Sequence, residues 1–319
     1  MSWKAPVKSR RCYNLSAMGR RGFWPSITSG VFVACLAFLT SCTSQPSTEH
    51  YEAIDGDSLR EVLSDGSTVE MRYIAINAIA KEHPLGAEAR ELNARLIQAA
   101  QDEGTIFVDR MPVFETDGGQ DVYGRPLVRV LLAGEEKPCE SIGVRLVAEG
   151  LARLDVRDPV DKNIAAGEDF GVLCADRLIE AQIEAARLRK GLWGELDEHG
   201  ESDVAIAAIK QWGEDEIVYI INRGQQPVDL QAGWRLTDSS GHELRFSDSQ
   251  CLPIPPGGIL RVHSGVSLVE TEPSDCSGGN LLWRSSSTWN QDGDTAFLYD
   301  PEGVLKYEYS YPLKGDRWE

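Results

Sequence analysis

Four cysteines beyond the first fifty residues could cross-link this chain: Cys139, Cys174, Cys251 and Cys276. Outside the cytoplasm, an even number of cysteines favours disulfides. The favoured pairing joins Cys139 to Cys174 and Cys251 to Cys276, because each pair then lies within one predicted domain. The other two connectivities and free thiols remain open. A zinc site is not expected, since the sequence has no Cys-x-x-Cys motif and its five histidines are scattered.

The first 41 residues have the pattern of an export signal. Six basic side chains and no acidic ones occur there, and an uncharged run leads to Cys42. Its apolar centre, at 31–39, is too short to span a bilayer, which needs about 20 apolar residues, but it suits a signal peptide. The segment Leu39-Thr-Ser-Cys42 resembles the lipobox of bacterial lipoprotein precursors. This implies that residues 1–41 are removed and that Cys42 carries a lipid. The alternative is a plain secretory leader that ends near a cysteine.

Removal of this leader would leave a strongly acidic protein. The whole chain has 32 Lys and Arg against 50 Asp and Glu, a net charge of −18. Without the six basic residues of the leader, 26 basic residues face 50 acidic ones, and the net charge is about −24. Such a charge repels nucleic acid over a Debye length of about 8–10 Å. Non-specific nucleic-acid binding is therefore excluded, and any such binding needs a local basic focus.

The length and the residue pattern divide the mature chain into two domains. In the first half, strand-like segments flank an Asp-Gly turn at 64–67, and helices are expected near 86–101 and 173–190. The polar segment 195–203 predicts a linker. Short strands separated by turns follow it, which is typical of an all-β sandwich. We therefore expect a small five-stranded β-barrel of the OB type with helices, followed by a β-sandwich.

Five short motifs of the first half occur in the order found in staphylococcal nuclease-like domains. Each motif alone is weak, but the five in sequence are specific, and residues 51–194 resemble this thermonuclease-like family. The resemblance implies an OB-type barrel with three helices and calcium-dependent hydrolysis of DNA and RNA. The motifs are Asp55-Gly-Asp57-Ser58, Arg72 in Met-Arg-Tyr-Ile-Ala-Ile-Asn77, Asp121-Val-Tyr-Gly-Arg125, Val147-Ala-Glu-Gly-Leu-Ala152 and Lys190-Gly-Leu-Trp193.

The same resemblance implies roles for individual residues. Asp57 and Asn77 would bind calcium, and Arg72 and Arg125 would hold the phosphate, for which a planar and permanently charged guanidinium is well suited. Asp121 is expected to stabilise the loop that carries Arg125. The two arginines would supply the local basic focus, so the expected ligand is single-stranded or unstructured nucleic acid.

The chain departs from the family at two positions. The family reads Asp-x-Pro-Glu where this chain reads Asn77-Ala-Ile-Ala80. One calcium ligand therefore loses its charge, and the glutamate that acts on the attacking water is absent. Glu82, two residues further on, is the candidate replacement base. The alternative is a domain kept for binding or architecture, in which Asp57 and the two arginines form an ordinary ion-pair cluster.

The second half resembles the lamin-tail domain. The similar segments are 216–222, 228–234, 255–258 and 289–300, and the Trp-Asn-x-Asp-Gly-Asp stretch from Trp289 to Asp294 is the most specific. The resemblance implies an immunoglobulin-like β-sandwich that binds or tethers without catalysis. The Asp-Gly-Asp part of the stretch favours a turn over a calcium loop, because the spacing and the final glutamate of an EF-hand are missing.

Together these features predict a lipoprotein of the bacterial envelope, facing the periplasm or the exterior, with Thr43 after the lipidated cysteine mildly favouring the outer membrane. One hypothesis is a membrane-tethered nuclease attenuated by Asn77 and Ala80, with calcium as its cofactor. The other is a non-catalytic envelope binding or scaffold lipoprotein. The expected partners are the membrane through the N-terminal lipid, nucleic acid, and an unidentified envelope ligand of the sandwich. The predicted boundaries are 1–41 signal peptide, 42–50 tether, 51–194 nuclease-like domain, 195–203 linker and 204–319 sandwich.

Overall fold

The computed structural model describes most of the chain after residue 49. The described residues all belong to one compact unit, Ser47–Glu319. The predicted signal peptide, the predicted lipidation site Cys42, nearly all of the tether, most of the linker, Cys251 and Cys276 lie outside the described residues. No described helix is long and apolar enough to cross a membrane. The described residues are 50–110, 120–121, 123–133, 137, 139–156, 174–195, 203–213, 215–248, 253–265 and 279–312.

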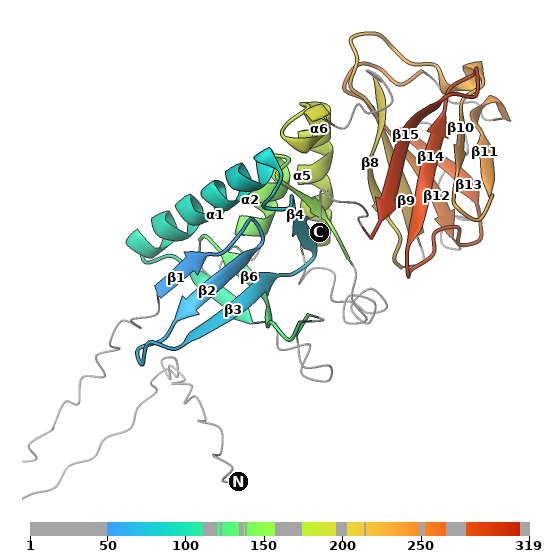
Figure 1. Ribbon diagram of the computed structural model, residues 1–319. Coiled ribbons are helices and arrows are strands. Elements are labelled where there is room, and N and C mark those ends of the chain that lie inside the picture. The colour runs from blue at the N-terminus through green and yellow to red at the C-terminus, as the bar shows by residue number, and fades with distance from the viewer. Residues whose placement is uncertain are drawn as a thin grey trace, which may run out of the picture. The chain divides into compact units, whose positions relative to one another are not determined.

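A five-stranded sheet forms the base of the first half (Figure 1). The hairpin of residues 58–73 in this sheet contains the predicted Asp-Gly turn, in which the Asp65 side chain accepts a 2.8 Å hydrogen bond from the Ser67 amide and Gly66 has a φ of 81°. The hairpin prediction is therefore confirmed. In the order in which they hydrogen-bond, the strands are β1 (His50–Ala53), β2 (Ser58–Val62), β3 (Thr68–Tyr73), β6 (Leu127–Leu131) and β5 (Phe107–Arg110).

This sheet is not the closed barrel that the sequence predicted. Within the described residues no pairing joins the edge strands β1 and β5, so the sheet is open and the OB-fold is not confirmed. The chain leaves the sheet after β3, where Ala75 has a left-handed backbone with a φ of 61°. The next strand, β4 (Ile76–Ala78), pairs instead with β7 (Ala152–Leu154) in a separate two-stranded sheet. The supported fold class is mainly β with few helices and several sheets.

Helices pack on the five-stranded sheet and on the β4–β7 pair. In chain order, the first helix (α1, Pro84–Asp102) contacts β1, the second (α2, Ile142–Ala148) contacts β6 and β7, and the third (α5, Ala175–Arg187) contacts β7 (Figure 1). The first and third agree with the predicted helices to within a few residues. The second completes the three helices that the resemblance implies, but the residue pattern did not locate it, because seven residues are too few to show a clear helical period. The helices are α1 (Pro84–Asp102), α2 (Ile142–Ala148), α5 (Ala175–Arg187) and the short α6 (Leu192–Glu195).

A disulfide joins the start of α5 to the segment before α2. Cys139 and Cys174 are bonded, with Cα atoms 5.4 Å apart, and they are the first of the two predicted pairs. The crosslink spans 35 residues of sequence, which include α2 and β7. In the chain-entropy description, a crosslink of this length stabilises a fold by about 3–4 kcal/mol. The disulfide therefore helps to hold α5 against the rest of the first half.

The second half is a sandwich of two four-stranded sheets. Its strands are short and separated by turns, as the sequence predicts. One sheet has the order β11 (Glu243–Arg245), β10 (Arg235–Thr237), β14 (Asp294–Tyr299) and β15 (Leu305–Tyr311). The other has the order β13 (Asn280–Arg284), β12 (Ile259–Gly265), β9 (Asp215–Asn222) and β8 (Val204–Lys210).

The buried apolar side chains of both halves belong to one continuous core. Helix α5 of the first half packs against strands β8 and β9 of the sandwich. The apolar stripe that the sequence predicts for this helix is buried except at Leu188, which is 50% exposed; its residues are Cys174, Leu178, Ala181, Ala185 and Leu188. The described residues of the two halves therefore form a single unit.

Candidate functional site

The motif residues of the first half converge on one cavity of about 320 Å³. The cavity lies where the turn before β2, strands β3 and β4 and the loop before α1 meet. It brings together all five residues for which the sequence predicted a catalytic or metal-binding role. Its lining residues are Asp55, Gly56, Asp57, Arg72, Asn77, Ala78, Ile79, Ala80, Lys81, Glu82 and Arg125.

The turn before β2 is built tightly around Asp55 and Gly56. One Asp55 carboxylate oxygen accepts hydrogen bonds from the Asp57 amide at 3.1 Å and from the Ser58 hydroxyl at 2.6 Å. A Cβ atom at Gly56 would lie 2.5 Å from the Cβ of Ala78, so only glycine fits between the turn and β4. Asp55 therefore shapes the turn that holds Asp57 in place.

The Asp57 side chain is buried, and the protein itself satisfies both of its oxygens. Oδ2 accepts a 2.6 Å hydrogen bond from the Ala78 amide, and Oδ1 accepts one from Nη1 of Arg72. Burial raises the pKa of Asp57, while the charge of Arg72 and these two hydrogen bonds act in the opposite direction. Neither oxygen is left facing the cavity without a hydrogen-bond donor.

Arg72 links Asp57 to β4. Its Nη2 donates to the Asn77 side-chain oxygen at 2.7 Å and to the Ile76 carbonyl at 3.3 Å. The Asn77 oxygen that the sequence predicted as a calcium ligand is thus already a hydrogen-bond acceptor for Arg72. The three side chains form a closed cluster in which the arginine bridges an anion and an amide.

Arg125 is held by the loop that contains it. Asp121 accepts hydrogen bonds from the Tyr123 amide at 3.0 Å, from the Arg125 amide at 2.8 Å and from Nε of Arg125 at 2.7 Å. The guanidinium also lies 5.6 Å from the centre of the Tyr123 ring, which is 82% exposed. Asp121 therefore has the loop-stabilising role that the sequence predicted.

Glu82 and Ala80 lie on the wall of the cavity next to α1. The Glu82 side chain is 67% exposed, and its described charged partner is its neighbour Lys81, at 3.6 Å. Its side chain has no hydrogen bond to Asp57 or Arg72, and position 80 contributes no carboxylate. The cavity thus contains the candidate base but does not connect it to the buried cluster.

These residues do not fit a calcium ion. Calcium takes six to eight oxygen ligands, several of them carboxylate oxygens. Here Asp55 is used in its turn, Asp57 is used by Arg72 and Ala78, and Asn77 is used by Arg72. Among the described residues no group of three or more His, Cys, Asp or Glu side chains is arranged to hold a metal.

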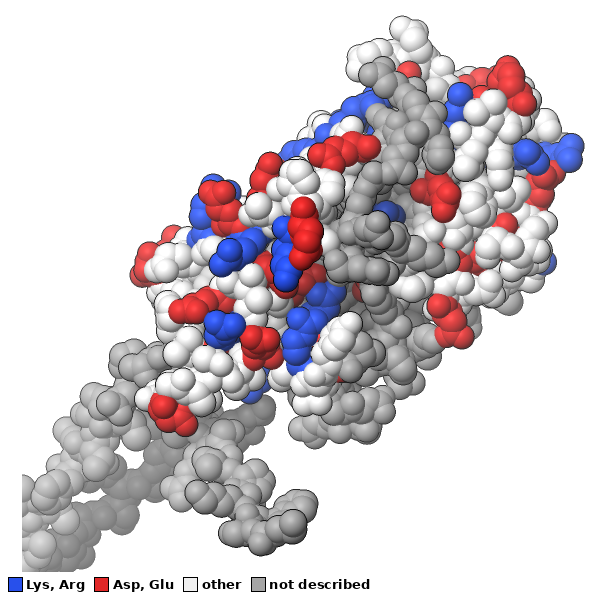
Figure 2. All heavy atoms as spheres, in the orientation of Figure 1, with Lys and Arg blue, Asp and Glu red and all other residues white. Residues whose placement is uncertain are grey.

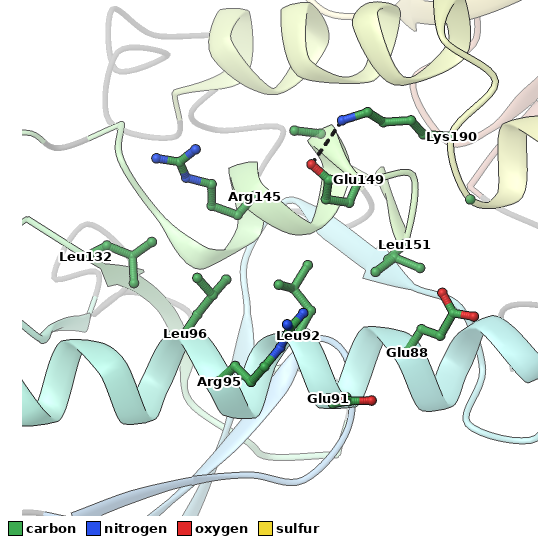
Figure 3. A pocket seen from close by; sticks show the side chains of 12 residues that line it. Glu88, Glu91, Leu92, Arg95, Leu96, Leu132, Arg145, Glu149, Leu151 and Lys190 are labelled. Atoms are coloured by element: carbon green, nitrogen blue, oxygen red, sulfur yellow. Dashed lines mark hydrogen bonds and ion pairs between the residues drawn. The ribbon is translucent and has the colours of Figure 1, made fainter.

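A larger cavity, of about 780 Å³, lies between α1 and α2 (Figure 3). Leu92, Leu96 and Leu151 form part of an apolar floor, and charged side chains of both signs surround it. One of these, Lys190, donates a 3.0 Å hydrogen bond to Glu149. The sequence did not predict this cavity, and its mixed rim favours no particular charge on a ligand.

In the sandwich, the stretch from Trp289 to Asp294 forms the turn that leads into β14. The buried Asp294 carboxylate accepts hydrogen bonds from the Asn290 amide at 3.2 Å, from its Nδ2 at 2.9 Å and from the Ser239 amide at 3.1 Å. It thus joins this turn to the loop between β10 and β11. The predicted turn is confirmed, and the Asp294 oxygens accept hydrogen bonds from backbone amides and side chains of the two loops.

The comparisons with known proteins agree with this sandwich. Residues 198–312 match the family model of the lamin tail domain. A comparison of the chain with curated proteins finds no match. The resemblance of the second half to the lamin-tail domain is therefore confirmed, while the nuclease-like resemblance of the first half stays a prediction.

Two buried polar residues where the first half meets the lamin tail domain were missed by the sequence analysis. Gln182 on α5 and Arg153 on β7 are 0% and 6% exposed. The only sequence signal was the position of Gln182, four residues after Leu178 on the apolar stripe of the predicted helix. A buried position was therefore foreseeable for Gln182, but its partner was not.

Proposed function

We propose that this chain is an exported, lipid-anchored envelope protein that binds or scaffolds and does not cleave nucleic acid. The observation that carries the proposal is the internal pairing of the cavity. Each of the three cations that line it faces a carboxylate: Arg72 faces Asp57, Arg125 faces Asp121, and Lys81 faces Glu82. Such a cavity has neither a free anionic site for a metal nor an uncompensated basic site for a phosphodiester.

The charge of the surface supports the same proposal. Over the described part of the face in Figure 2, Lys and Arg alternate with Asp and Glu. Tight nucleic-acid binding relies on clustered basic groups that displace the counterions of the phosphates. Dispersed pairs on a chain with a mature net charge of about −24 do not provide such a cluster.

The membrane anchor is a proposal from the sequence. Removal of residues 1–41 would leave the lipid on Cys42, with the tether to residue 50 keeping the first half near an envelope membrane, for which the outer membrane is proposed. A Cys42→Ser variant is expected to move from the membrane fraction to the soluble fraction, and its unchanged distribution would contradict lipid anchoring.

The lamin tail domain supplies the binding half of the proposal. Its family resemblance implies binding or tethering, and the tight hydrogen bonding of its turns by buried acids such as Asp294 suits a rigid recognition module. We propose that it binds a component of the envelope, so that the chain would link this component to the membrane.

The second candidate is a calcium-dependent nuclease that cleaves single-stranded or unstructured nucleic acid. It is favoured by the convergence of Asp57, Arg72, Asn77, Arg125 and Glu82 on one cavity. It requires Asp57 and Asn77 to release Arg72 and to bind a calcium ion in its place.

A cleavage assay distinguishes the two candidates. Residues 43–319 are incubated with single-stranded DNA and with RNA, in millimolar calcium and in chelator, next to an Arg125→Ala variant. Arg125 lines the cavity from a loop outside the helices and strands, so its replacement is expected to keep the fold, and the variant reports contaminating nucleases. We expect no calcium-dependent cleavage above the level of the variant. Calcium-dependent cleavage that Arg125→Ala abolishes would overturn the proposal and support the nuclease.

A further inference from the structure

The side chain of Gln182 connects the first half to both sheets of the lamin tail domain. Its Oε1 accepts a 2.7 Å hydrogen bond from the Leu154 amide on β7. Its Nε2 donates to the Ala207 carbonyl on β8 at 2.8 Å and to the Tyr309 hydroxyl on β15 at 2.9 Å. One fully buried amide thus joins strands from three different sheets.

The Ala207 carbonyl is available because β8 contains a bulge at this point. In the pairing of β8 with β9, Ile206 lies opposite Ile220 and Ala208 lies opposite Tyr219, so Ala207 is the extra residue. The extra residue of a bulge is left out of the ladder. A buried carbonyl without a donor is unfavourable, and Gln182 supplies that donor from the first half. The bulge and the glutamine are therefore complementary parts of one junction.

Strands β8 and β15 are edge strands of their two sheets, so the junction covers one open side of the sandwich. Next to Gln182, the guanidinium of Arg153 lies 4.0 Å from the centre of the Tyr309 ring and 5.3 Å from that of Trp193. Nη1 of Arg223 on the lamin tail domain side donates to the Trp193 carbonyl at 3.1 Å. Edge strands covered in this way are unavailable for pairing with another chain.

The junction is also directly connected to the cavity that contains Arg72. Leu154 and Arg153 belong to β7, where they lie opposite Ile76 and Asn77 of β4. Asn77 and the Ile76 carbonyl are the groups that Arg72 contacts on β4, and the next residue, Ala78, donates its amide to Asp57. A two-stranded sheet has no further strand to hold it, so its position depends on the helices that pack on it: α2 contacts both strands, and α5, which carries Gln182, contacts β7.

We infer that Gln182 is a positioning residue through which the lamin tail domain holds β4, and with it the closed cluster of Asp57, Arg72 and Asn77. Gln182 would fix the geometry of the cluster whether or not the cavity is catalytic. The lamin tail domain would then stabilise the first half in addition to binding any ligand of its own.

Hydrogen exchange measured by mass spectrometry on residues 43–319 tests this inference. In a Gln182→Leu variant, the Ala207 carbonyl and the Leu154 amide lose their partners, which is expected to speed exchange in peptides spanning residues 74–80 by about tenfold or more. Gln211→Leu is the matched control, because it makes the same change at a buried glutamine of the lamin tail domain that takes no part in the hydrogen bonds of Gln182. The control is expected to leave exchange at 74–80 unchanged.

A Gln182→Glu variant separates positioning from general destabilisation. Burial raises the pKa of an introduced carboxyl and the nearby Arg153 guanidinium opposes this, so a fall from about pH 8 to about pH 5 moves the carboxyl towards the protonated form that can donate to the Ala207 carbonyl. At about pH 8 it is a carboxylate that faces a carbonyl oxygen. Protection of residues 74–80, corrected for the intrinsic pH dependence of exchange, is therefore expected to match wild type at pH 5 and to be lost at pH 8. Three results would overturn the inference. Residues 74–80 could be as protected in Gln182→Leu as in wild type, they could lose the same protection in Gln182→Leu and Gln211→Leu, or Gln182→Glu could fail to regain their protection at pH 5.

Discussion

Replacing Arg72 with alanine is expected to lower the free energy of unfolding at neutral pH by about 3–5 kcal/mol, the usual cost of removing one partner from a buried ion pair. The side chains of Arg72 and Asp57 are only 19% and 6% exposed, so water cannot readily replace the guanidinium. The variant would leave Asp57 buried as an anion with one hydrogen bond, from the Ala78 amide, and would remove the donor to Asn77.

The cost of Arg72→Ala is expected to depend on pH. Burial already raises the pKa of Asp57, and Arg72 is the main group that lowers it. Without the arginine, the folded-state pKa of Asp57 rises further above its value in the unfolded chain. The deficit in stability is then fully present above this raised pKa and shrinks as the pH falls towards the unfolded value, because the neutral carboxyl tolerates burial.

Chemical denaturation of both proteins between about pH 5 and pH 8 measures this effect. Arg177→Ala is the control, since the side chains of its pair with Glu180 are 59% and 65% exposed and pairs of that kind contribute only about 0–1 kcal/mol. An Arg72→Ala variant as stable as wild type, or more stable, would contradict a structural role. Residues retained for ligand binding often cost stability, and their removal then stabilises the fold.

Replacing Trp193 with alanine is expected to destabilise the protein by about 3–5 kcal/mol, as for other buried large-to-alanine changes. Trp193 is fully buried on α6, and its ring contacts the guanidinium of Arg153, while its carbonyl accepts a hydrogen bond from Arg223 of the lamin tail domain. Because the two halves share one core, the loss is expected to lower the stability of both in one transition.

Unfolding monitored by circular dichroism and by fluorescence of the remaining tryptophans, among them Trp212 and Trp289, checks this expectation. Trp193→Phe is the matched control. The indole N–H of Trp193 is buried without an acceptor among the described residues, so phenylalanine keeps most of the packing and removes an unsatisfied donor. We expect it to cost less than Trp193→Ala, because it leaves a smaller cavity. Two separate transitions in Trp193→Ala, with only one shifted, would show that the halves unfold independently.

Local patterns in the sequence were sufficient for most of the elements. The Asp-Gly turn, the apolar stripe of α5 and the turns of the lamin tail domain each depend on a few neighbouring residues, and the structure confirms them. The convergence of Asp57, Arg72 and Asn77 was also foreseeable, because their motifs occur in a known order. The turns and the stripe are short-range signals, and the convergence of the three side chains follows from the resemblance of the motifs to a family.

Long-range geometry was not foreseeable. Closure of the barrel depends on hydrogen bonds between β1 and β5, far apart in the sequence, and on whether the chain stays in the sheet after β3, where Ala75 turns it away. The motifs gave Arg72 and Asn77 as separate functional groups, and only the structure shows that the first donates to the second. The junction at Gln182 likewise needs a bulge in β8, which leaves no mark in the alternation of Val204 to Lys210.

We propose that Asp57 belongs to an internal ion pair and not to a metal site. Thermal unfolding of residues 43–319 in calcium and in chelator, with Asp57→Asn in parallel and magnesium as the control for ionic strength, distinguishes the two. A site occupied at ten times its dissociation constant would stabilise the fold by about 1.4 kcal/mol. We predict that calcium produces no increase in melting temperature beyond that of magnesium. A calcium-specific increase that Asp57→Asn abolishes would contradict the claim and restore the nuclease hypothesis.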